Sequence, residues 1–99
     1  MNKDITTCMG YQQITLGAAS TALTVPSIDP NTGQNAMPTH AVIIVDAVSI
    51  RWRDDGVDPT SAIGMPLLPG TVFIYDGDLR KLRFIRTAVG SILNVSYYK

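Results

Sequence analysis

The chain is short of the residue types on which many enzymes and metal sites depend. It has one cysteine, Cys8, and one histidine, His40, and all of its acidic residues are aspartate. A single cysteine excludes an intramolecular disulfide, and these two residues do not supply the ligands of a zinc site. No glycine-rich phosphate loop or nucleophile-elbow sequence is present, although a Ser-His-Asp arrangement stays open from residue types alone. We therefore expect no enzyme activity and no cofactor, with an inert Cys8.

The chain also has little charge. Eight basic residues balance eight acidic ones, and charged residues make up 16% of the sequence, against an ordinary share of about 25%. No net field attracts nucleic acid or an anionic membrane, and little repulsion opposes self-association. The longest apolar run, residues 41–45, is far shorter than a membrane span. Residues 1–7 lack an apolar stretch, so we expect no signal peptide and synthesis in the cytoplasm.

The missing glutamate and the plentiful Val, Ile, Thr and Tyr favour β structure. The 99 residues predict one domain, with about the first ten residues as a flexible arm. Turn signals separate eight segments that we expect to be strands: residues 11–16, 21–26, 40–46, 47–53, 65–68, 71–76, 79–86 and 91–98. The sequence therefore predicts an all-β fold, a single antiparallel β-sandwich or jelly-roll-like barrel of about seven to eight short strands.

Two neighbouring segments predict how the sheet faces are covered. Residues 40–46 are nearly all apolar, which is typical of a central strand covered on both faces. Residues 47–53 alternate, so Trp52 is expected in the core and Arg51 and Arg53 on the opposite face. Residues 79–86 fit a helix in part, but their length and alternation favour a strand.

Two clusters of charge raise the question of a binding site. Asp54, Asp55 and Asp58 could together suit calcium, but no further acid follows at a spacing that completes a known loop. We interpret them as an aspartate-rich turn, since Asp-Gly favours turns, and leave the cation question open. Four basic residues lie between positions 80 and 86. They predict a solvated or salt-bridged surface, with contact to an acidic partner or to phosphates as the alternative.

The part of the chain from His40 onward carries a family resemblance. The strand that ends in Arg-Asp-Asp-Gly at residues 53–56 is followed by Pro-Thr at 59–60 and Gly-Met-Pro-Leu at 64–67. An aromatic strand at 71–75 and Asn-Val-Ser-Tyr-Tyr at 94–98 complete the pattern. This combination resembles small structural proteins encoded among the virion genes of tailed bacteriophages.

The resemblance implies a non-enzymatic virion protein, first of all a capsid decoration or cement protein on the outer shell. Its partners would be the major capsid protein or other virion proteins, with self-assembly into a homo-oligomer such as a trimer, and without nucleic acid or membrane. Its location would be the particle surface. The alternatives are a tail, baseplate or fibre-attachment domain, or a small receptor- or glycan-binding module with Tyr75, Tyr97 and Tyr98 as candidate aromatics. The expected partner contacts are Ile28, Asn31, Met37, Arg51, Arg53, Asp58, Ile63, Arg80 and Arg83.

Overall fold

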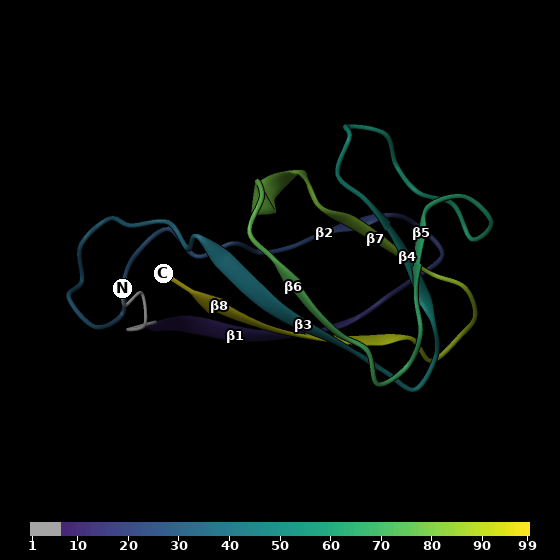
Figure 1. Ribbon diagram of the computed structural model, residues 1–99, viewed down its shortest axis with the longest axis horizontal. Coiled ribbons are helices and arrows are strands. Elements are labelled where there is room, and N and C mark those ends of the chain that lie inside the picture. The colour runs from purple at the N-terminus through teal and green to yellow at the C-terminus, as the bar shows by residue number, and fades with distance from the viewer. Residues whose placement is uncertain (1–6) are drawn as a thin grey trace.

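The computed structural model describes residues 7–99 as two antiparallel four-stranded sheets packed into a β-sandwich (Figure 1). Sheet A has the order β1-β8-β3-β6, and sheet B has the order β2-β7-β4-β5. The elements in chain order are β1 (Cys8–Thr15), β2 (Thr21–Ala22), β3 (His40–Asp46), β4 (Ile50–Arg53), β5 (Met65–Leu67), β6 (Val72–Tyr75), the 3-10 turn η1 (Leu79–Lys81), β7 (Arg83–Arg86) and β8 (Ile92–Tyr98). The predicted all-β sandwich is therefore confirmed.

The strand pairing has a nested pattern. The first strand pairs with the last, the second with the seventh, the third with the sixth and the fourth with the fifth. A long antiparallel hairpin rolled across two sheets gives this pairing, which is the arrangement of a jelly roll. The protein is therefore a β-sandwich whose strands are connected as in a jelly roll.

The core lies between the sheets and follows the two-residue period of the strands. In β8, Leu93, Val95 and Tyr97 are buried, whereas the residues between them are half-buried on the outer face. Phe84 of β7 and Ile50 of β4 meet them from sheet B and are fully buried. Alternate side chains of a strand point to opposite faces, so each strand contributes every second residue to this core.

The N-terminal strands differ in length from the prediction. β1 begins at Cys8, and Met9 is buried, so the predicted arm does not extend to residue 10. Residues 1–6, where the rest of that arm was expected, lie outside the described part. β2 has two residues instead of the predicted six, because the amide of Thr24 turns to the side chain of Gln12. That contact replaces a backbone ladder beyond Ala22.

The chain passes from sheet A to sheet B between β3 and β4. Ala47 has a φ of 72° there, a left-handed conformation that suits a sharp turn. The predicted strand 47–53 is therefore shortened to the four residues of β4. Trp52 is half-buried at the rim of the core, with its ring centroid 4.8 Å from that of Phe73 and 6.0 Å from that of Tyr75. It joins β4 to β6 rather than occupying the centre of the core.

The segment 79–86 also starts differently from the prediction. Its first three residues form η1, which Asp78 caps by accepting a hydrogen bond from the amide of Arg80. A capping aspartate favours such a turn because it satisfies an amide at the start of the helix. The strand β7 therefore begins at Arg83, and Leu79 is buried within the turn.

Candidate interaction surfaces

The outer face of sheet B is partly covered by the loop of residues 54–64. Arg51 points outward from β4, and its guanidinium donates to the carbonyls of Ser61 at 3.2 Å and Gly64 at 2.8 Å. Gly64 has a φ of 144°, and a Cβ there would lie 3.1 Å from the Cβ atoms of Arg51 and Pro59. The chain therefore needs glycine at this point to lie close against β4. Pro59 is buried, and Ile85 on the outward side of β7 is only 7% exposed. In Figure 1 this loop lies on the side of sheet B that faces away from sheet A.

The three aspartates of this loop each accept hydrogen bonds from a different partner. Asp54 accepts from the hydroxyl of Tyr75 at 2.6 Å, and Asp58 accepts from the hydroxyl of Ser20 at 3.1 Å. Asp55 accepts two hydrogen bonds from Arg53, which lower its carboxyl pKa. Burial and the bond to Asp54 raise the pKa of Tyr75 to about 12. Among residues 7–99 no three acidic, cysteine or histidine side chains gather as metal ligands.

A shallow apolar depression lies where this loop meets β5. Its volume is about 420 Å³, and its lining residues are Arg53, Asp54, Asp55, Ile63, Gly64 and Met65. Ile63 and Met65 are 59% and 57% exposed, so two large apolar side chains face solvent beside the Arg53–Asp55 ion pair. We call this depression the loop patch. It combines apolar surface with a charged rim, as protein-binding sites do.

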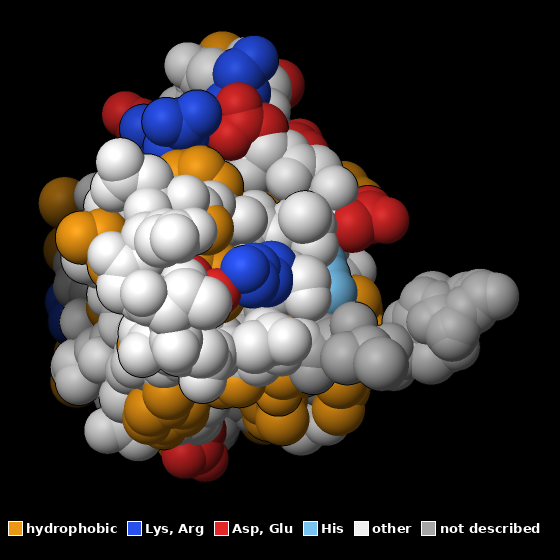
Figure 2. Space-filling view, turned by 90° about the vertical axis from the view of Figure 1, so that its left-hand side faces the viewer, with side chains coloured by type: hydrophobic (Ala, Val, Ile, Leu, Met, Phe, Trp, Pro, Cys, Tyr) orange, Lys and Arg blue, Asp and Glu red, His pale blue; other side chains and the backbone are white. Residues whose placement is uncertain are grey.

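The outer face of sheet A carries a second apolar surface. Val42 and Ile44 of β3 lie beside Ile74 and Val72 of β6, in the register of the paired strands. Ile44, Val72 and Ile74 are 39%, 59% and 64% exposed. We call these four residues the sheet A patch. Strand β3 is thus interior to its sheet, as predicted, but the prediction that both its faces are covered is wrong for this chain by itself. Figure 2 shows hydrophobic side chains along the lower edge of the molecule, the side on which sheet A lies in Figure 1.

Polar side chains continue the same face beyond the sheet A patch. Asn94 and Ser96 of β8 lie next to Ile44 and Val42 in the strand register. Asn94 accepts hydrogen bonds from the Tyr11 hydroxyl at 2.6 Å and from the Gln13 amide at 3.1 Å. The outer face of sheet A therefore has an apolar half over β3 and β6 and an uncharged polar half over β8 and β1.

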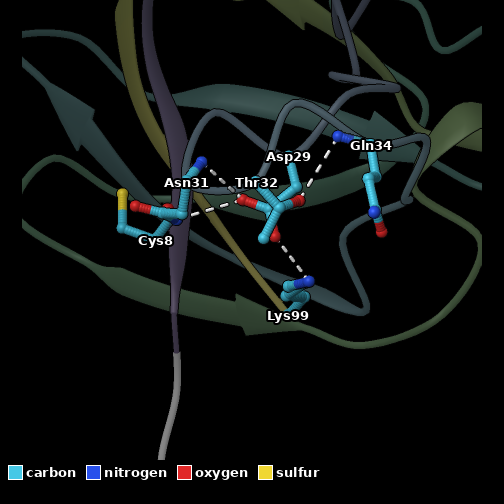
Figure 3. Close-up of polar contacts among 6 residues, drawn as sticks. All are labelled: Cys8, Asp29, Asn31, Thr32, Gln34 and Lys99. Atoms are coloured by element: carbon cyan, nitrogen blue, oxygen red, sulfur yellow. Dashed lines mark hydrogen bonds and ion pairs between the residues drawn. The ribbon is translucent and has the colours of Figure 1, made fainter.

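The long loop of residues 27–39 is fastened at the end of the sandwich around Asp29 (Figure 3). Asp29 is 1% exposed, and one carboxylate oxygen lies 2.5 Å from Nζ of Lys99. Its other oxygen accepts from the amide and the side chain of Asn31. The hydrogen bond from Lys99 lowers the pKa of the Asp29 carboxyl, and the bonds from Asn31 lower it further. The bonds of Asn31 to Asp29 therefore hold the loop together, and Asn31 is itself exposed, as are Ile28 and Met37.

The basic cluster around η1 is divided in its roles. Arg83 donates to the carbonyls of Arg80 and Leu82 at 2.7 and 2.9 Å. Arg80 projects into solvent, with its side chain 71% exposed and a long 4.0 Å contact to Asp78. The cluster is thus partly a solvated surface and partly a set of bonds that hold η1 in place.

The remaining candidate residues lie apart from one another. His40 stacks on Tyr98 with ring centroids 5.6 Å apart, and its ring nitrogen Nδ1 lies 2.9 Å from the hydroxyl of Thr39. Cys8 is exposed on β1. Burial raises the pKa of Tyr97 to about 12, and its hydroxyl donates to Gln12 at 2.7 Å. Tyr75, Tyr97 and Tyr98 do not form one aromatic platform, because Tyr97 is buried and Tyr75 bonds to Asp54 at another place.

Comparison with known proteins adds no relative to this geometry. The chain matches no family model, no curated protein and no solved structure. In residues 7–99 no helix has the length and apolarity to cross a membrane. The physical properties of the surfaces therefore carry the functional argument, together with the resemblance described in the sequence.

The predicted contact residues fall into four separate places. Arg53 and Ile63 meet in the loop patch, and Asp58 lines a different depression beside Ile85. Ile28, Asn31 and Met37 share the loop of residues 27–39, and Arg80 and Arg83 lie around η1. The bonds that Arg51, Asn31 and Arg83 make within the chain hold its loops, so partner contact through them stays a prediction. The sheet A patch was missed, although the apolar run of residues 41–45 carried its signal.

Proposed function

We propose that this protein is a non-enzymatic structural component of a tailed-bacteriophage particle, a decoration or cement protein bound to the outer capsid. The observation that supports this role best is the amount of large apolar surface left exposed on a small, charge-poor sandwich. Ile63 and Met65 in the loop patch and the sheet A patch are exposed together in a chain of zero net charge. Contiguous exposed apolar patches favour binding to other proteins.

The fold agrees with this role without deciding it. Jelly rolls occur in viral capsid domains and also in lectins, so the fold by itself is an analogy. The resemblance of residues 53–56, 64–67 and 94–98 to virion proteins supports a structural role in the particle. We assign the contact with the shell to the loop patch, where an apolar depression and the Arg53–Asp55 ion pair lie side by side. The loop of residues 27–39, with Ile28 and Met37 exposed, offers a further contact at another place.

Cryo-electron microscopy of the particle that carries this protein tests the proposal. Many copies in regular positions on the outer shell are the expected result. A few copies at the tail or neck would replace it by the tail, baseplate or fibre-attachment role. Absence from the particle would contradict every virion role and favour the receptor- or glycan-binding alternative, which binding to host cells or glycans would then test.

A matched pair of variants tests the assigned surface. Purified protein is added to shells that lack it, and the bound fraction is measured by sedimentation. Ile63→Lys places a charge in the loop patch and should weaken binding by more than about tenfold, since an unpaired charge is costly to bury. Val89→Lys changes a residue that is 78% exposed outside the patch and should bind like the original protein. Equal binding by both variants would contradict the assignment to the loop patch.

A further inference from the structure

We propose that the outer face of sheet A is an interface between two copies of this chain, packed face to face about a two-fold axis. The inference rests on the proposed function as an assembly component, and it names the surface through which the protein binds itself. It leaves the loop patch free for the shell.

The first support is the composition of this face. Val42, Ile44, Val72 and Ile74 form one contiguous apolar block, because β3 and β6 pair in that register. The four strands of sheet A contain no lysine or arginine. Between its end rows, which carry Asp46 and His40, the face is apolar in one half and uncharged in the other, so its burial costs less hydration than that of a charged surface.

The second support is that the register makes this face complementary to itself. We place a two-fold axis in the plane of the interface, perpendicular to the strands, between the row of Ile44 and the row of Val42. This axis sets each strand opposite the same strand of the second copy, with the two strands running in opposite directions. Ile44 then faces Val42 of the second copy. By the same operation Val72 faces the second copy's Ile74, since Ile44 pairs with Val72 and Val42 with Ile74. Apolar side chains therefore meet apolar side chains, as a two-fold interface requires.

The polar half of the face follows the same operation. Asn94 pairs with Ile44 and Ser96 pairs with Val42, so Asn94 of one copy faces Ser96 of the other. An amide and a hydroxyl can each donate and accept hydrogen bonds, so these rows can bond to each other across the interface. Packed sheets lie about 10 Å apart with their strands about 30° from alignment, which leaves room for such contacts.

The polar side chains at the two ends of β3 are also matched by this two-fold axis. Asp46 and His40 lie at opposite ends of β3 on this outer face. The two-fold axis therefore brings Asp46 of each copy near His40 of the other, and not near the second Asp46. A carboxylate can accept a hydrogen bond from an imidazole, so no like charges meet in this arrangement.

The size of the face predicts a reversible dimer. The strands β1, β3, β6 and β8 have 8, 7, 4 and 7 residues, and strands about 4.8 Å apart with a rise of about 3.3 Å per residue give a flat area of roughly 400 Å² per copy. Two copies would together bury about 800 Å², which is below the range of stable complexes and is typical of weak, transient contacts. We therefore expect a dissociation constant in roughly the micromolar range, a strength that many copies concentrated on one lattice would increase.

Sedimentation velocity of the purified chain tests the inference, over concentrations from about 1 to about 500 µM. The original protein should change from monomer to dimer within this range. Ile74→Lys should stay monomeric, with dimerisation weakened by more than about tenfold, because the new ammonium would be buried against a second copy. Val89→Lys is the control, since Val89 is 78% exposed and lines a depression beside Ile85 on the outer side of sheet B, and it should dimerise like the original. Ile44→Asp is a second variant that should also stay monomeric.

Circular-dichroism melting of each variant shows that it is folded before its mass is interpreted. A protein that stays monomeric throughout, or an Ile74→Lys variant that dimerises like the original, would overturn the inference. Growth beyond the dimer would also overturn it, because a two-fold interface closes on itself. The test needs no particle, so a failed dimer and a failed capsid location are separate results.

Discussion

The outer faces of the two sheets differ in how they are covered. Ile85 of β7 and Ile44 of β3 are the same residue type at outward positions of interior strands, yet Ile85 is 7% exposed and Ile44 is 39% exposed. The loop of residues 54–64 covers the first, and no segment of residues 7–99 covers the second to the same degree. The difference teaches that an apolar side chain on the outer face of a sheet favours burial. Another segment of the same chain or another molecule can bury it.

The two long loops explain this difference. Arg51 ties the loop of residues 54–64 across sheet B through two carbonyl contacts. The loop of residues 27–39 is instead fastened at the end of the sandwich by the Asp29–Lys99 ion pair. It therefore does not extend over the sheet A patch. Part of the outer face of sheet B is therefore covered by the chain itself, whereas Ile44, Val72 and Ile74 on the outer face of sheet A stay exposed.

The largest effect should come from removing the contact that joins the two sheets at their rim. Trp52→Ala deletes the ring that packs on Phe73 and Tyr75. We expect a loss of about 3 kcal/mol in the free energy of unfolding, at the lower end for a large aromatic because Trp52 is half-buried. Urea denaturation measures this loss, and Trp52→Phe should lose less than half as much. An unchanged midpoint for Trp52→Ala would mean that Trp52 is not part of the core.

A smaller effect should follow from releasing the cover of sheet B. Arg51→Met keeps an apolar stem but removes the donors to Ser61 and Gly64. We expect a loss of about 2 kcal/mol, the range for hydrogen bonds from a charged group, and faster amide hydrogen exchange in the loop of residues 54–64. Arg53→Met is the control, since it removes an ion pair with Asp55 at the surface, and surface ion pairs contribute little to stability. Equal losses would contradict the special role of Arg51.

The smallest effect should come from the Asp29–Lys99 ion pair, which fastens the loop of residues 27–39. This effect depends on pH. The pKa of Asp29 is lowered, first by the hydrogen bond from Lys99, so its ionised form is favoured in the folded state. The stability it contributes is therefore present above the ordinary aspartate pKa of about 3.9 and is lost as pH falls through the folded value. Asp29→Asn should have a lower melting temperature than the original protein at pH 7. The difference between the two melting temperatures should become smaller below about pH 4.

Thermal melting from neutral to strongly acidic pH measures that difference. Lys99→Met is the matched variant, because it removes the first cause of the lowered pKa and should move the acid loss of stability to higher pH. A gap between Asp29→Asn and the original protein that does not change with pH would show that the ion pair does not fasten this loop.

Much of the fold was predictable, because period-two alternation and turn residues can be recognised within short segments of the sequence. The buried residues of β8 and the start and end of β3 follow from this pattern alone. The shortening of β2 was not predictable, since it depends on the side chain of Gln12 from another strand. The turn η1 was missed because the Asp78 cap competes with alternation over the same residues.

The candidate surfaces were less predictable for a similar reason. The exposure of Ile63 follows from its place in a polar loop, and it was expected. The use of Arg51 and Arg83 as internal donors depends on loop carbonyls that only the folded chain brings near. The sheet A patch was not predicted, because an apolar strand indicates that both of its faces favour burial. It does not indicate whether this chain or another molecule buries the second face.

The meeting of Thr7 and Lys99 has a mechanical consequence. These residues exchange two backbone hydrogen bonds at 3.0 and 3.1 Å, and they lie at the same end of the antiparallel pair β1 and β8. A pulling force applied at residues 7 and 99 would open that pair like a zipper, one rung at a time, and each rung would resist alone. A force applied along the strands, at opposite ends of the pair, would instead shear β1 against β8 and load all of its rungs together. An attachment that bears load is therefore weakest where it pulls residues 7 and 99 apart.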